Sequence, residues 1–114
     1  MNQQKIKEQN EVIDLAVQHF GVERQLDKVI EEMSELSQAL LKWKWRYENG
    51  VKIKDQKQLR LKLLDEFVDV SVTLRQLKRV MEFSQKDIDN LSELKITRLN
   101  NLIMSQKKSK NGRK

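Results

Sequence analysis

The stretch LRLKLLDEFVDVSVTLRQLKRVM, residues 59–81, decides the fold of this chain. Its apolar residues recur at alternating steps of four and three, the period of a helix that buries one stripe against a neighbouring helix. The stripe consists of Leu59, Leu63, Phe67, Val70, Leu74, Leu77 and Met81. It predicts a helix over about 55–82 that packs antiparallel on the helix before it.

Two helices are predicted on the N-terminal side of this stretch, over about 3–20 and about 23–47. Gly21 is placed to end the first of them, and Asn49-Gly50 to end the second. The second carries one apolar stripe, formed by Leu26, Val29, Ile30, Met33, Leu36, Leu40 and Trp43. The apolar residues of both segments have helical spacing, so two helices are predicted to precede the helix at about 55–82.

A fourth helix is predicted to begin after Ser84, which with Asp87 resembles a capping box, and to reach about Met104. Its apolar stripe is thin, and three apolar residues of the third helix lie outside the main stripe: Leu64, Val68 and Val72. Apolar side chains exposed on single helices need neighbouring helices that cover them. We therefore expect an all-α, antiparallel bundle of about four helices, assembled as a homo-oligomer, a homodimer or a homotetramer.

The length of 114 residues suits one domain, which we expect over 1–104. Residues 105–114 hold five of the basic side chains and no acid, so this segment is expected to be a disordered tail and the rest of the chain is nearly neutral. The absence of cysteine excludes disulfides, a thiolate nucleophile and Cys-ligated metal sites. A cytoplasmic protein is expected because cysteine is absent, and one without membrane contact because no apolar run reaches the roughly 18 residues that span a membrane.

The two long central helices each carry a doubled acidic motif. Glu32 and Glu35 lie three residues apart in one, and Glu66 and Asp69 in the other, so each pair shares a helix face. All four border the apolar stripes. Carboxylates gathered at a partly buried helix pair repel one another, and a hard divalent cation relieves that repulsion. Oxygen ligands favour Mg²⁺, with Mn²⁺ as a substitute, over zinc.

A plainer explanation of the same acids is a solvated helix surface paired with basic residues such as Lys28, Arg60 and Lys62. A di-iron carboxylate bundle is a rival metal site, but it needs Glu-x-x-His pairs, and His19, the single histidine, does not follow a glutamate by three. The spacing leaves a magnesium site and a solvated acidic surface as the two explanations.

The ordered motifs Glu-Glu-x-x-Glu at 31–35 and Glu-x-x-Asp at 66–69 resemble those of the all-α nucleoside triphosphate pyrophosphohydrolases, specifically the compact MazG-like proteins. The resemblance covers most of the chain. Shorter matches are His19-Phe20-Gly21, Gln25-Leu26, Leu74-x-x-Leu77-Lys78 and Lys95-x-x-Arg98-Leu99. The stretch between the two acidic motifs is long for the family, and the basic tail has no counterpart in it.

The resemblance implies hydrolysis of a nucleoside triphosphate to the monophosphate and pyrophosphate, as part of nucleotide-pool housekeeping. Glu32, Glu35, Glu66 and Asp69 would bind Mg²⁺, and the cation would clamp phosphate oxygens and acidify a water molecule. Glu31 would be a fifth carboxylate, an orienting residue or the base, and Glu35 is a second catalytic candidate.

Other residues are candidates for binding the substrate. Lys95 and Arg98 would neutralise phosphates, although an ordinary solvated basic face explains them as well. Trp43 would stack on the base, and His19 and Gln25 would line its pocket. Core packing, a helix end and a helix cap are the corresponding structural explanations.

Two other functions compete with the enzyme. One is a non-catalytic helical oligomer or regulatory protein that retains the fold. The other is a nucleic-acid-binding protein that uses the basic tail together with Lys42, Lys44 and Arg46, but no recognition signature for DNA or RNA accompanies these residues. Nucleic acid is therefore not the expected partner.

Overall fold

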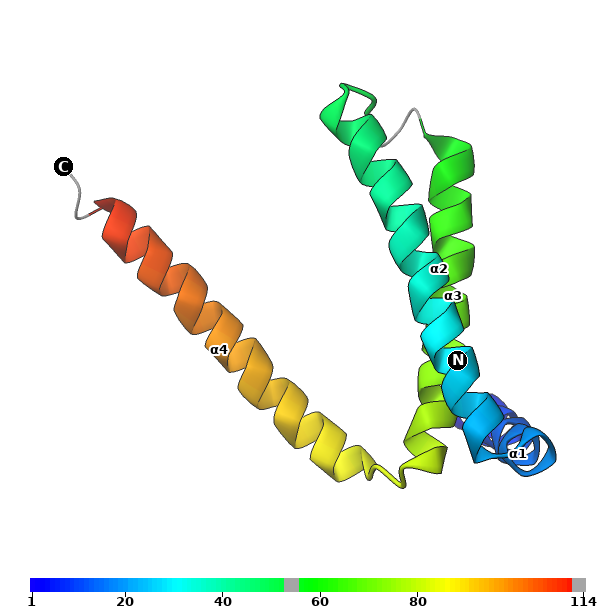
Figure 1. The fold of residues 1–114 in the computed structure, drawn as a ribbon. Helices are drawn as coiled ribbons and strands as arrows, with labels where there is room; N and C mark the ends of the chain where they lie inside the picture. Colours follow the sequence, from blue (N-terminus) through cyan, green and yellow to red (C-terminus); the bar gives the residue numbers. More distant parts are fainter. Residues whose placement is uncertain (53–55, 112–114) are drawn as a thin grey trace. The chain divides into compact units, whose positions relative to one another are not determined.

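The structure is a computed structural model that describes residues 1–52 and 56–111. Within these ranges the chain is all-helical, with four α-helices and no strand, which confirms the expected fold class. The helices are α1 (Gln3–Phe20), α2 (Val22–Glu48), α3 (Lys57–Val80) and α4 (Gln85–Asn111) (Figure 1). Among the described helices, none combines the length and the apolar character needed to cross a membrane.

The helix ends follow local signals that the sequence carries. The side chain of Asn2 accepts a hydrogen bond from the backbone N–H of Lys5 at 2.8 Å and so starts α1. Gly21 ends it with φ at 85°, a conformation that glycine adopts without strain. At the start of α4, Ser84 Oγ accepts from the N–H of Asp87 at 3.1 Å. The predicted start of α4 is therefore confirmed.

Two predicted ends need correction. The third helix begins at Lys57, not near residue 55, and residues 53–55 lie outside the described part of the chain. Helix α4 continues to Asn111, past the end expected at Met104 and through the first residues of the segment assigned to a disordered tail. Gln and Lys have good helix propensity, and lysines are favoured in the last turns by the helix dipole. Charge alone therefore did not end the helix.

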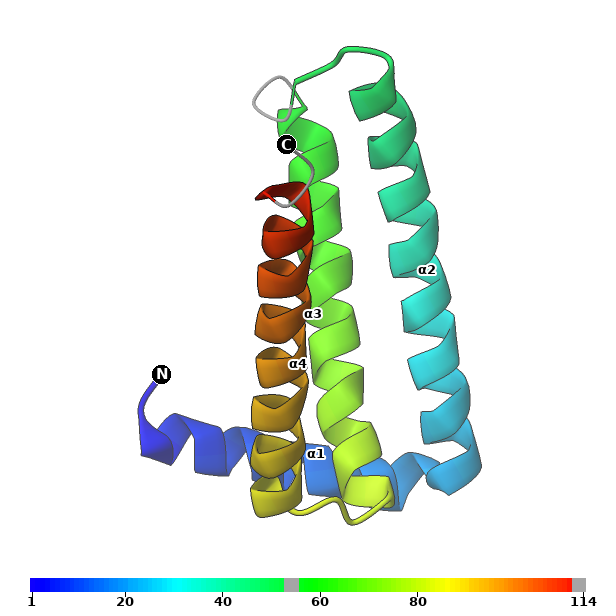
Figure 2. The same ribbon diagram turned by 90° about the vertical axis from the view of Figure 1, so that its left-hand side faces the viewer.

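The chain divides into two compact units, Met1–Glu82 and Phe83–Lys114. In the first unit, α2 and α3 run antiparallel along each other, and α1 lies across the end where α2 begins and α3 ends (Figure 2). Arg79 Nε pairs with Asp14 Oδ1 at 2.9 Å, which ties α3 to α1. In the second unit, the described residues form α4.

Polar side chains occupy much of the seam between α2 and α3. Buried there are Gln25, Val29, Glu32 and Ala39 of α2 and Glu66 and Thr73 of α3. The predicted stripes are therefore only partly correct. In the third-helix stripe, four residues are half-buried: Leu59, Leu63, Val70 and Leu77. The other members of that stripe, Phe67, Leu74 and Met81, are exposed, and so are three members of the α2 stripe: Ile30, Met33 and Leu40. Leu64, Val68 and Val72, expected on a second buried face, are exposed as well.

The exposed apolar residues follow the buried ones by one position: Ile30, Met33 and Leu40 in α2, and Phe67 and Leu74 in α3. One residue along a helix is a rotation of about 100°. Because the helices are antiparallel, this rotation carries both sets to the same side of the hairpin. We call these five residues the apolar face. The opposite side presents Lys28, Glu31, Asp69 and Val72, so the two sides of the hairpin differ in chemistry.

Candidate metal centre

Glu32 and Glu66 face each other from the two long helices at seam positions where apolar residues are normally found. They are 6% and 8% exposed. The Oε2 atom of each is buried and has no hydrogen-bond partner within the described residues. Burying a carboxylate in this way is costly unless a positive charge or several donors neutralise it. These two oxygens are therefore unsatisfied acceptors.

Glu35 completes a cluster of three acids. One carboxylate oxygen each of Glu32, Glu35 and Glu66 lies within 4.8 Å of the other two. Glu32 and Glu35 are three residues apart on α2, and α3 brings Glu66 to them across the seam. Oxygens bound to one Mg²⁺ at roughly 2.0–2.1 Å from the ion lie at most about 4.2 Å apart. The three carboxylates therefore need only a small side-chain movement to share a cation.

The negative charges of the cluster act on one another. The pKa of the Glu35 carboxyl lies above its ordinary value, chiefly because of the charge on Glu32, with further contributions from partial desolvation and from Glu66. Glu35 itself is exposed to solvent. Repulsion within the triad is therefore felt even at its most hydrated member, which is the condition that a divalent cation relieves.

Two lysines partly neutralise the buried acids. Lys28 Nζ lies 2.9 Å from Glu32 Oε1 and 4.0 Å from Glu31 Oε2, and its bond to Glu32 raises the pKa of the ammonium group. Lys62 Nζ lies 3.8 Å from Glu66 Oε1. The surface pairing considered from the sequence is thus present for Lys28 and Lys62. Each lysine reaches one oxygen of its partner and leaves the buried Oε2 unpaired.

Asp69, the fourth acid of the motifs, is not one of the three that converge. It is half-buried on α3 and lines a cleft of about 600 Å³ together with Glu31 and Glu32. The cleft therefore opens beside the triad, with Glu32 belonging to both.

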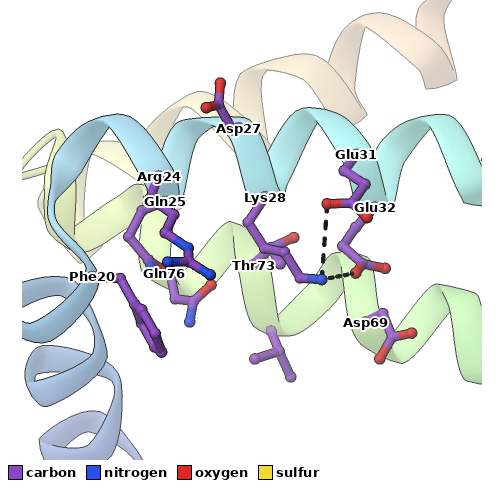
Figure 3. A pocket seen from close by; sticks show the side chains of 11 residues that line it. Phe20, Arg24, Gln25, Asp27, Lys28, Glu31, Glu32, Asp69, Thr73 and Gln76 are labelled. Atoms are coloured by element: carbon purple, nitrogen blue, oxygen red, sulfur yellow. Dashed lines mark ion pairs between the residues drawn. The ribbon is translucent and has the colours of Figure 1, made fainter.

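The cleft has two chemically different ends (Figure 3). Glu31, Glu32 and Asp69 lie at one end, Lys28 and Thr73 near the middle, and Phe20, Arg24, Gln25 and Gln76 at the other end. Gln25 is 4% exposed, and the Oε1 atoms of Gln25 and Gln76 are buried without a hydrogen-bond partner in the described chain. Phe20 adds an aromatic wall, with the Arg24 guanidinium 5.2 Å from its ring centre.

Several residues that line the cleft were not predicted as site residues from the sequence, among them Phe20, Lys28 and Gln76. A signal for Gln76 existed, because Asp69, Val72 and Gln76 recur at three- and four-residue steps and so share one helix face. Lys28 was considered only as a neutralising partner of the acids.

The remaining predicted site residues lie elsewhere. Trp43 does not line the cleft, and its ring stacks on Tyr47 at 5.2 Å between centres. His19 is exposed at the end of α1, edge-on to Phe20, which does line the cleft. Lys95 and Arg98 are exposed on α4, in the second unit. Of the three predicted base-binding residues, the structure brings Gln25 into the cleft.

Comparisons with protein-family models, with curated proteins and with solved structures found no match to this chain. The resemblance described above rests on the motifs themselves, and the arrangement of their side chains is the remaining basis for a function.

Proposed function

We propose that the protein is a Mg²⁺-dependent nucleoside triphosphate pyrophosphohydrolase that cleaves substrate to the nucleoside monophosphate and pyrophosphate. The observation that supports it best is the pair of buried, unpartnered Oε2 atoms of Glu32 and Glu66, with a Glu35 oxygen within 4.8 Å of the cluster. A set of carboxylate oxygens fits Mg²⁺, with Mn²⁺ as a substitute, and does not select zinc.

The chain's own residues divide the work along the cleft. Glu32, Glu35 and Glu66 would hold the cation, with Asp69 as a further ligand beside them. The bound cation supplies positive charge to the phosphate oxygens and lowers the pKa of an attacking water. Glu31, on the cleft and well exposed, would accept the proton of that water.

The base would occupy the opposite end of the cleft. Gln25 and Gln76 offer buried amide oxygens there, and Phe20 offers an aromatic surface. A planar group with N–H donors satisfies the first and packs on the second. This arrangement favours Gln25 over Trp43 as a base-binding residue. Lys95 and Arg98 remain candidates for phosphate binding from α4.

Assembly as a homo-oligomer is part of the proposal. The apolar face exposes Ile30, Met33, Leu40, Phe67 and Leu74 on the side of the hairpin that faces away from the cleft. A second copy that covers this face would leave the cleft open to a cytoplasmic nucleotide. A homodimer through this face, or a homotetramer that includes it, satisfies the requirement.

A nucleotide panel tests the activity directly. The purified protein is incubated with canonical, deoxy and damaged nucleoside triphosphates and Mg²⁺, and pyrophosphate release is measured. We expect release from at least one nucleotide, its loss with a chelator, and its loss in Glu66→Gln. Activity that is absent for every nucleotide, with wild type and variant alike, would reject the proposal.

The alternative is a non-catalytic helical oligomer or regulatory protein that keeps the fold. The ion pairs of Lys28 and Lys62 favour it, because they neutralise part of the acidic charge without a metal. It predicts no pyrophosphate release and no change in stability on adding Mg²⁺. Thermal unfolding with and without Mg²⁺ therefore separates the two functions even when the substrate is unknown.

A further inference from the structure

Of the two described basic residues that line the cleft, Lys28 lies in its middle and Arg24 lies at the amide end. Lys28 lies on α2 one turn before Glu32, lines the cleft and stands between the carboxylate end and the amide end (Figure 3). Its side chain is 50% exposed, so the ammonium group can leave its present partner for another without being buried first. The order along the cleft is amides, ammonium, carboxylates.

The present partner of Lys28 belongs to the same carboxylate that a cation would use. Nζ lies 2.9 Å from Glu32 Oε1, whereas Oε2 of the same carboxylate is the buried unpartnered atom. A divalent cation on Glu32 places like charge next to the ammonium and weakens its attraction to the carboxylate. The four-carbon stem of lysine lets the charge move several ångströms while the helix stays fixed.

Lys62 provides a built-in comparison. It forms the same i,i+4 pair with a buried glutamate, with Nζ 3.8 Å from Glu66 Oε1, and it is similarly exposed. It lines a different hollow, formed with Arg46, Gln56 and Lys57, and does not line the cleft. Neutralising a buried acid is therefore a role of both lysines, and only Lys28 also faces the space between the two ends of the cleft.

We propose that Lys28 exchanges partners: it neutralises Glu32 while the carboxylates hold no cation, and it binds a phosphate group of the nucleotide when they do. The inference rests on the proposed function and adds a phosphate-binding residue to it. A nucleotide that lies with its base at the amide end and its phosphates at the carboxylate end must pass Lys28. In this role Lys28 is a phosphate-binding residue that also limits metal binding in the absence of substrate.

The exchange of partners predicts that one substitution of Lys28 changes the affinity for Mg²⁺ and the affinity for a nucleotide in opposite directions. In Lys28→Met, Mg²⁺ alone should bind more tightly, by roughly threefold to tenfold, because the competing ammonium is gone. The α,β-methylene analogue of the best-hydrolysed nucleotide, with saturating Mg²⁺, should bind roughly tenfold or more weakly, because a charge-assisted bond to phosphate is lost. Both affinities are measured by isothermal titration calorimetry.

Two controls complete the experiment. Lys62→Met should change the affinity for Mg²⁺ in the same direction but leave the affinity for the analogue unchanged. Lys28→Arg should restore analogue binding, because it keeps the charge. A merely structural role for Lys28 would lower both affinities of Lys28→Met together, and unchanged analogue binding would also overturn the inference. A wild type that binds no Mg²⁺ and hydrolyses no nucleotide would reject the proposed function along with it.

Discussion

At the scale of single residues, Glu66 is where stability and metal binding oppose each other most directly. Its carboxylate is buried in the seam, Oε2 has no described partner, and the single lysine near Oε1 is itself largely hydrated. Glu66→Gln removes the buried charge and strands no other, because Lys62 remains in water. We expect the metal-free protein to gain about 1–2 kcal/mol in free energy of unfolding.

The same substitution should remove the stabilisation that Mg²⁺ gives the wild type. Urea unfolding of both proteins, each with and without Mg²⁺, measures the two effects together. Glu48→Gln is the matched control, because Glu48 is an exposed glutamate of α2 paired with Lys44 and should show neither effect. If metal-free Glu66→Gln is less stable than the metal-free wild type, the carboxylate of Glu66 is satisfied in the folded state.

Glu35 should make stability and metal binding depend on pH. Its pKa in the folded protein is raised above the ordinary value of 4.5, mainly by the charge on Glu32. A folded state that holds the proton more tightly than the unfolded state loses stability as pH rises between these two pKa values. Without metal, wild type should therefore be less stable than Glu35→Gln at neutral pH, and the difference should shrink as pH falls through this window.

Magnesium binding responds to the same group in the opposite sense. A proton on Glu35 competes with the cation, so affinity for Mg²⁺ should fall as pH is lowered through the raised pKa and stay constant above it. Calorimetric titrations at a series of pH values measure this dependence. An affinity profile that is identical in wild type and Glu35→Gln would place Glu35 outside the metal site.

At the scale of helices, periodicity predicted the number and the ends of most elements but not which residues fill the seam. In α3 the buried positions Glu66 and Thr73 directly precede Phe67 and Leu74, which the apolar pattern had placed in the seam. The two stripes differ by one residue, so hydrophobicity alone chooses the wrong one when the seam holds a polar site. The convergence of Glu32 and Glu35 followed from their three-residue spacing, whereas the same spacing did not bring Asp69 into the cluster with Glu66.

Other features of the site could not be read from the sequence. The side chain of Gln76 lines the same end of the cleft as that of Gln25 only because α2 and α3 are antiparallel with a particular register, and no local signal fixes that register. Trp43 was favoured for its aromatic ring, but its neighbour one turn later, Tyr47, satisfies it by stacking. Contacts between helices decide such cases, and the pattern along one helix does not contain them.

The apolar face of the hairpin predicts how the chain associates. Phe67 on this face is 61% exposed, and Leu61, two positions after the half-buried Leu59, points away from the seam and is 55% exposed. Phe67→Asp should dissociate the oligomer, because it buries a charge in the proposed interface. Leu61→Asp should leave the mass of the assembly unchanged. Sedimentation equilibrium compares them. Dissociation by both variants, or by neither, would locate the interface elsewhere.

At the scale of the whole molecule, the described chain buries little apolar surface for its length. Its buried hydrophobic residues are Ile13, Val29 and Ala39, while large apolar side chains are exposed on every described helix. A core this small does not offset the conformational entropy lost on folding. We therefore expect association to supply much of the stability, so that folding and assembly form one equilibrium.

This coupling makes thermal stability depend on protein concentration. Each tenfold increase in concentration favours a folded dimer by about 1.4 kcal/mol, which corresponds to a rise of roughly 3–6 °C in Tm for a molecule of the size of the dimer. Differential scanning calorimetry over a hundredfold range of concentration tests it. Leu61→Asp should keep this dependence, whereas Phe67→Asp should show no cooperative transition over the same range of concentration. A wild-type Tm that does not change with concentration would mean that the monomer is stable without association. The exposed apolar face would then not be an interface on which folding depends.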